Sequence, residues 1–149
     1  MTLRLALLAF LLATAAHSAD DAPSLVKYRQ TVMKSIGAHM TAMSLVVKKR
    51  VTRRTQLAAH AESIHALSGD IATLFPQGTD STKVATAALP AVWSQPDKFA
   101  AAAKALERES AKLAEVARGT DAAAFDVQFT KVSDACNSCH KTFRERESE

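Results

Sequence analysis

The chain carries four long stretches in which apolar residues recur every three or four positions. They cover about residues 24–47, 53–74, 97–118 and 121–146. This spacing puts the apolar side chains on one face of a helix. No stretch shows the strict alternation that is typical of a strand. Four such helices, joined mostly by short turns, predict an all-α fold, an antiparallel up-down-up-down four-helix bundle.

Residues that favour helix ends lie between these stretches. Ser24 is a candidate N-cap of the first helix, Gly78 follows the second, and Gly119 ends the third. The one long irregular stretch covers roughly residues 75–96. Loops of this length within a compact domain are uncommon unless they serve a site. We therefore expect a functional role for this loop.

The beginning of the chain has a different pattern. Arg4 precedes an uninterrupted apolar run at residues 5–13, and small residues follow up to Ala19. This order is typical of a secretory signal peptide, and the run is too short to span a membrane. We expect residues 1–19 to be removed on export. Residues 20–149 then form a single periplasmic domain without membrane insertion.

The charge of the chain argues against one class of partner. The formal net charge is +4 over 149 residues, and loss of Arg4 with the signal peptide leaves +3. A mildly basic surface favours acidic partners. The chain has only one Trp and one Tyr, so its basic residues are not interleaved with aromatic ones. We therefore expect no binding to nucleic acid.

The only two cysteines lie near the end of the fourth predicted helix, in a Cys-x-x-Cys-His motif. On a helix Cys136, Cys139 and His140 project from one face, so two thiols can bond one porphyrin while the imidazole reaches its iron. A thioredoxin-like redox pair would need strands, and a structural zinc site would need more ligands. The motif predicts one covalently attached haem c with His140 as an axial iron ligand.

The motif does not identify a second axial ligand. The candidates are Met33, Met40, Met43, His39, His60 and His65. In an up-down-up-down bundle the start of the first helix lies beside the end of the fourth. Met33 fits this level, whereas Met40 lies about 10 Å further along its helix. His65 is the second choice. From position alone, Met33 is equally well explained as a ligand or as a core residue.

Two segments far apart in the sequence carry a family resemblance. Residues 28–30 (Tyr-Arg-Gln) together with residues 136–144 resemble the cytochrome c′ family, the class II c-type cytochromes. Residues 75–80 and 89–94 are similar to that family's loop between its second and third helices. The resemblance implies a four-helix bundle with the haem near the C-terminus. It also implies that Arg29 and Gln30 lie beside the haem and its propionates, and that Arg144 lines the pocket near His140.

One position separates two functions within this resemblance. High-spin members carry a non-ligating apolar residue where this chain has Met33, whereas low-spin members resemble it in placing a methionine there. A thioether on the iron raises the reduction potential and fills the site where a gas would bind. We therefore predict an electron-transfer protein, not an enzyme, with His140 and Met33 as axial ligands. The alternative is a high-spin five-coordinate protein that binds nitric oxide or another diatomic gas.

The expected partners follow from this prediction. Lys141, Arg144 and Arg146 lie near the predicted haem and can steer redox proteins with acidic docking surfaces. A denser cluster of cations at residues 48–54 lies at the opposite end of the predicted bundle, and we interpret it as a solvated turn. The resemblance also makes a homodimer through the first and second helices an expectation.

Overall fold

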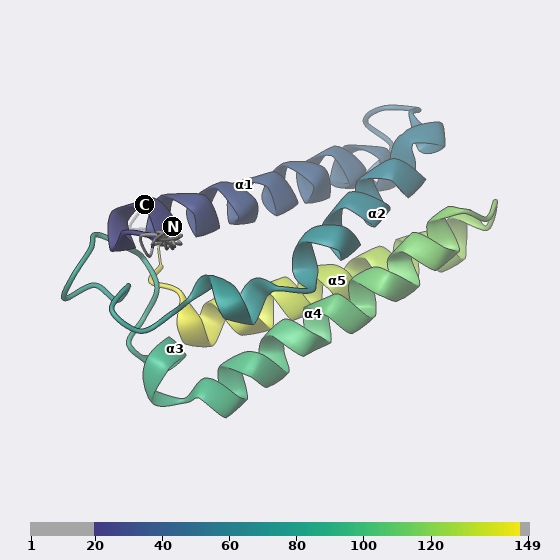
Figure 1. Cartoon of the computed structure of the whole chain (residues 1–149). Helices are drawn as coiled ribbons and strands as arrows, with labels where there is room; N and C mark the ends of the chain where they lie inside the picture. Colours follow the sequence, from purple (N-terminus) through teal and green to yellow (C-terminus); the bar gives the residue numbers. More distant parts are fainter. Residues whose placement is uncertain (1–19, 147–149) are drawn as a thin grey trace, which may run out of the picture.

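The computed structural model describes residues 20–146, and the expected signal peptide at residues 1–19 lies outside the described residues. Its main helices form a bundle in which neighbours along the chain run in opposite directions (Figure 1). The elements in chain order are α1 (Ala22–Val47), η1 (Arg54–Gln56), α2 (Leu57–Ser68), η2 (Ile71–Leu74), α3 (Ala91–Ser94), α4 (Pro96–Ala117) and α5 (Ala122–Phe143). Apart from one isolated bridge, these residues form no β-structure. The predicted all-α four-helix bundle is confirmed.

Local capping explains where the long helices begin. The carboxylate of Asp21 accepts hydrogen bonds from the backbone N–H and the hydroxyl of Ser24, both at 2.9 Å. Asp21 is therefore the N-cap of α1, and the helix begins before Ser24. Asp121 caps α5 in the same way, accepting from the N–H groups of Ala123 and Ala124. α4 begins on Pro96, a residue that is well suited to a first helical position.

The second helix is shorter than its apolar pattern predicts. Residues 53–74 divide into α2 with a short 3₁₀ turn on each side. At the end of α2 the buried Ser68 hydroxyl donates to the His65 carbonyl at 2.8 Å and lies 2.9 Å from the Ser110 hydroxyl of α4. Gly69, a poor helix former, follows directly. The helix therefore ends where it meets α4, and the next residues continue as η2.

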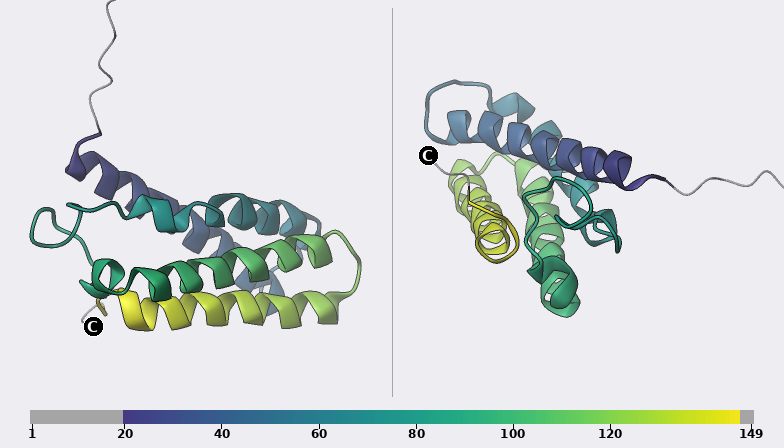
Figure 2. Two further views of the ribbon diagram at one scale, coloured as in Figure 1. Left: turned by 60° about the horizontal axis from the view of Figure 1, so that its bottom comes forward. Right: turned by 90° about the vertical axis from the view of Figure 1, so that its left-hand side faces the viewer.

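The helices do not all pack equally closely. Among the described residues α4 packs closely against both α5 and α2, and α2 packs against α1, but α1 and α5 are not a closely packed pair. Figure 2 shows α4 and α5 side by side while α1 crosses above them. The core between the helices includes the fully buried side chains of Met43, Ile64, Leu113 and Val132. α4 is thus the central helix of the bundle.

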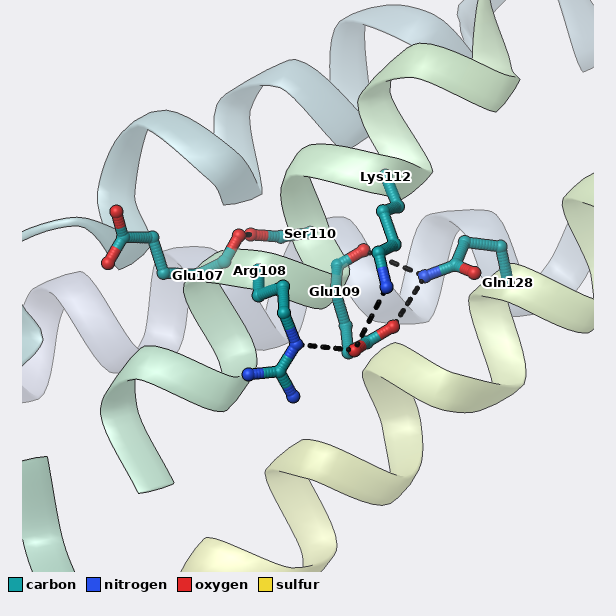
Figure 3. Close-up of polar contacts among 6 residues, drawn as sticks. All are labelled: Glu107, Arg108, Glu109, Ser110, Lys112 and Gln128. Carbon is teal, nitrogen blue, oxygen red and sulfur yellow. Dashed lines mark hydrogen bonds and ion pairs between the residues drawn. The ribbon is translucent and has the colours of Figure 1, made fainter. Parts of the chain in front are cut away.

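A polar contact fixes α4 against α5 (Figure 3). The buried Gln128 of α5 donates from Nε2 to the Glu109 carbonyl and to Glu109 Oε2, both at 3.0 Å. Arg108 Nε lies 3.0 Å and Lys112 Nζ 3.7 Å from Glu109 Oε1. The hydrogen bond from Gln128, followed by Arg108 and Lys112, keeps the pKa of Glu109 below its usual value. This contact sets the register of the helix that carries the cysteines.

Within residues 20–146, none of the helices combines the length and the apolar character that a membrane span requires.

Candidate haem-binding site

The last two turns of α5 place the Cys-x-x-Cys-His side chains on one face. Cys136 and Cys139 are free thiols, half-buried and in contact with the core. Burial, together with the neighbouring Cys139, raises the pKa of Cys136 to about 11, and burial also raises the pKa of Cys139. Both sulfurs are therefore protonated thiols at neutral pH. Two thiols on one face of α5 are also the arrangement that two thioether bonds to a single porphyrin ring require.

The imidazole of His140 is exposed beside these thiols. Partial burial of the ring, and then the positive charge of Arg144, lower its pKa below the usual value. The ring is therefore neutral at neutral pH, which is the form that coordinates a metal. Among the described residues no group of three or more His, Cys, Asp or Glu side chains could hold a metal ion by itself. One imidazole beside two thiols therefore fits a metal ion that is already bound by a porphyrin ring.

The chain after His140 is fixed to the long loop. The Leu89 N–H donates to the Phe143 carbonyl at 2.9 Å, and the Glu145 N–H donates to the Ala87 carbonyl at 2.7 Å. Ala88 and Arg144 form the isolated antiparallel bridge between these two bonds. α5 therefore ends at Phe143, and not near Arg146 as the sequence pattern predicts. This pairing holds the loop and the end of α5 at the same place.

Arg29 of α1 is buried in the same loop, with 2% of its surface exposed. Its guanidinium donates to the Thr79 hydroxyl at 2.6 Å, to the Thr79 carbonyl at 2.7 Å and to the Thr86 hydroxyl at 2.8 Å. It also lies over the rings of Phe75 and Trp93, at 4.6 and 5.6 Å from their centroids. Burial lowers its pKa, although a guanidinium remains charged. Sequence analysis did not identify the two threonines, because neither belongs to a recognisable motif.

The hydrogen bonds that the structure gives Arg29 all go to neutral oxygens. No acidic side chain in residues 20–146 forms an ion pair with it. A buried cation without an opposite charge is costly. A carboxylate from a group bound at this end of the bundle would compensate it, and haem carries two propionates. The environment of Arg29 therefore fits the predicted cofactor.

The structure also places the candidates for a second axial ligand. His39 and His60 form a hydrogen bond with each other, with 2.9 Å between their Nδ1 atoms. Met43 is completely buried. His65 is exposed between α2 and α4, where it lines a surface pocket. Met33 is half-buried and packs against the core one turn after Arg29, as does Met40 further along α1. Gln30 is half-buried beside Arg29.

The sequence model of the cytochrome c′ family matches residues 24–144, which include every site residue discussed above. The chain belongs to the cytochrome c′ family. A cytochrome c′ from Pararhodospirillum photometricum is 35% identical over 80% of this chain and 95% of its own length. A cytochrome c-554 from Cereibacter sphaeroides is 30% identical over 89% of this chain and 88% of its own length.

Solved structures of the family superimpose closely. The nitric oxide complex of a variant of cytochrome c prime from Alcaligenes xylosoxidans has a TM-score of 0.76 and is 27% identical, over 85% of this chain and 98% of that one. The carbon monoxide-bound form of another variant from the same organism gives the same values. The family match confirms the predicted cofactor, a covalently attached haem c.

These comparisons overturn one prediction. The interpretation as a low-spin electron-transfer protein, with both His140 and Met33 on the iron, is wrong because the similar solved structures hold nitric oxide or carbon monoxide. An iron with two protein ligands has no free axial position for such a molecule. The error came from Met33, whose place on the apolar stripe of α1 is equally typical of a core side chain.

Proposed function

We propose that this chain is a periplasmic haem protein that binds a diatomic gas, with His140 as the single protein ligand of a high-spin iron. The observation that carries the proposal is the similarity, over 98% of the neighbouring chain, to a cytochrome c prime that holds nitric oxide. The packing of this chain supports it, because α1 is not closely packed against the helix that carries His140. An iron with an open axial position binds small neutral ligands.

Each site residue has a distinct part in this proposal. Cys136 and Cys139 would hold the haem by two thioether bonds, and neutral His140 would ligate the iron, with Arg144 beside it. The loop-bound guanidinium of Arg29 compensates propionate charge, and Gln30 lies next to it on α1. When bound, the haem supplies the metal centre to which the gas attaches. The protein then acts by binding, and no catalytic residue is assigned.

Met33 has a different role in this proposal from the one that the sequence suggested. Its half-buried, apolar side chain packs against the core and would border the space beside the bound haem without bonding to the metal. There it excludes water and restricts the space that an incoming gas can occupy. A side chain of similar volume without sulfur, such as leucine, would do the same.

The remaining expectations belong to the same proposal. Cleavage after residues 1–19 would release the domain into the periplasm. A homodimer through α1 and α2 is supported by the exposed Tyr28 of α1. Redox proteins with acidic surfaces stay a prediction, since electron exchange with the iron is compatible with gas binding.

Optical spectra of the purified holoprotein test the function. We expect a high-spin ferric spectrum and a five-coordinate ferrous spectrum that changes on addition of carbon monoxide or nitric oxide. Met33→Leu should leave both spectra unchanged, and Met33→Ala should increase the rate of carbon monoxide binding by about tenfold or more, because it removes bulk from the ligand side. Met40→Leu serves as the matched control on the same helix.

A single result would contradict the proposal. If the ferric protein is low-spin, with the weak long-wavelength band of a methionine–iron bond, and Met33→Leu abolishes that band, then Met33 is an iron ligand and the gas site is closed.

A further inference from the structure

The turn between α1 and η1 carries the densest positive charge in the chain. Residues 48–54, which we term the basic turn, include five cations: Lys48, Lys49, Arg50, Arg53 and Arg54. All residues of this turn are exposed. The turn projects from the end of the bundle opposite the C-terminus of α5 (Figure 1). His140 lies about 27 Å along α5 from the start of that helix. Nothing in the proposed gas-binding function uses this turn.

The charges of the basic turn are largely uncompensated. Arg54 lies 3.9 Å from Asp126 and its guanidinium covers the ring of Phe125. Among residues 20–146, no ion pair involves Lys48, Lys49, Arg50 or Arg53. Four neighbouring cations without counter-ions repel one another, and this cost is recovered when a negatively charged surface approaches.

The backbone of the turn favours glycine at a position that lysine occupies. Lys49 has a φ of 56°, in the left-handed region where a side chain is unfavourable. Its N–H donates to the Val46 carbonyl, and the Arg50 N–H donates to the Leu45 carbonyl at 2.8 Å. This is the helix-ending geometry in which glycine is most common. The chain therefore keeps a positive charge at the tip of the turn at some expense of stability.

Two apolar side chains are exposed beside these cations. Leu45 is 44% exposed and Val51 is 40% exposed. They lie next to each other, because the N–H groups of Arg50 and Val51 both bond to the Leu45 carbonyl. Only two other large apolar side chains among the described residues are exposed, Tyr28 and Val127, and neither belongs to this turn. Apolar side chains flanked by lysine and arginine are typical of segments that bind the interface of an anionic membrane.

We propose that the basic turn docks the protein on an anionic phospholipid surface. The cations contact the headgroup phosphates while Leu45 and Val51 enter the interfacial layer. A projecting turn with long cationic side chains fits a flat, fluid surface, whereas an acidic protein would be expected to bury Leu45 and Val51 in a complementary pocket. Bound in this way, the bundle stands with its haem end away from the lipid and open to the aqueous phase.

Vesicle sedimentation with the holoprotein tests this inference. We expect binding to vesicles of three parts phosphatidylcholine and one part phosphatidylglycerol at low salt, and little binding to phosphatidylcholine alone. Each Lys or Arg near an anionic bilayer contributes about fivefold to the binding constant. The variant with Lys48→Gln, Lys49→Gln, Arg50→Gln and Arg53→Gln should therefore bind at least about 100-fold more weakly.

A matched variant separates the basic turn from net charge. Lys27→Gln, Lys34→Gln, Lys98→Gln and Lys131→Gln remove the same number of exposed cations elsewhere, and this variant should keep binding within about threefold. Haem absorption and circular dichroism establish that both variants are folded. Absence of wild-type binding to the anionic vesicles, or equal weakening in both variants, would overturn the proposal.

A second pair of substitutions distinguishes lipid from an acidic protein. Leu45→Ser with Val51→Ser should weaken vesicle binding about tenfold at moderate salt, where charge is partly screened. The same substitutions should not change binding to soluble polyglutamate. If the wild type binds polyglutamate as tightly as vesicles and the double variant loses neither, the turn recognises an acidic polymer and not a membrane.

Discussion

Two polar clusters in this bundle, each built around a buried polar side chain, balance their charge in different ways. Between α4 and α5, the amide of Gln128 bonds to Glu109, whose carboxylate also has Arg108 and Lys112 beside it. Positive and negative groups of the polypeptide meet there. The second cluster surrounds Arg29, whose guanidinium bonds only to the neutral oxygens of two threonines.

The difference separates a cluster in which the polypeptide supplies both charges from one in which the described residues supply only the positive charge. A buried ion is tolerated where its charge is compensated, and it is costly where it is not. The α4–α5 contact therefore needs no further group. The end of the bundle that holds Arg29, Cys136 and His140 reaches full compensation when a bound group brings negative charge.

Of the substitutions that test this difference, loss of the Arg29 guanidinium should change the free energy of unfolding most. We expect Arg29→Met to lower the free energy of unfolding of the holoprotein by about 3 kcal/mol, because it leaves polar partners in the loop without their donor. Urea unfolding followed by Trp93 fluorescence measures it. Arg29→Lys should not restore stability, since an ammonium lacks the planar fork that reaches both threonines.

The matched control for Arg29 is an exposed arginine. Arg118 is paired with Glu62 at the surface, so Arg118→Met should change stability by less than about 1 kcal/mol. Equal losses for the two arginines would mean that the hydrogen bonds of Arg29 to the loop contribute no more than an exposed ion pair.

The Gln128 contact should respond more moderately and without effect on the cofactor. We expect Gln128→Leu to lower the free energy of unfolding by about 1 kcal/mol, because the partly buried Glu109 carbonyl and carboxylate lose one hydrogen bond while Arg108 and Lys112 remain beside the carboxylate. Thermal unfolding provides the measurement. The haem absorption spectrum should remain that of the wild type, and a shift of that spectrum would show that the two clusters are coupled.

The smallest expected effect concerns the His39–His60 pair. Burial, and then His39, lower the pKa of His60 below its model-peptide value of 6.5. Over the pH range between the two pKa values, His60 binds a proton in the unfolded chain but not in the folded one. This contribution to stability is complete above about pH 6.5 and is lost as the pH falls. His60→Gln should flatten the decline in unfolding free energy between about pH 7 and 5.

Histidine 65 provides the comparison for that experiment. It is exposed on the same helix and lies outside the His39–His60 pair, so His65→Gln controls for the loss of one histidine from α2. A similar flattening in both variants would assign the slope to groups other than the His39–His60 pair.

What the sequence predicted correctly depends on neighbours along the chain. The apolar spacing of α1, α4 and α5, the stops at Gly119 and the common face of Cys136 and His140 are all local. The bundle class and the haem follow from them. The match to the family model over residues 24–144 supports the same identification.

The features that the sequence did not predict depend on distant contacts. Arg29 reaches Thr79, fifty positions away. α2 ends at Ser68 because of its contact with Ser110 of α4. Whether Met33 binds the iron depends on the distance between its sulfur and the metal. The apolar repeat of α1 predicts the face and the level of Met33 along the helix, but not that distance.

The bridge between Ala88 and Arg144 has a consequence for the order of folding. Because it joins residues 87–89 to residues 143–145, its backbone hydrogen bonds form only when two segments that are distant in the sequence meet. Closing so large a loop costs entropy, which local helix formation does not. The helices therefore form first, and the wall beside the cysteines closes last.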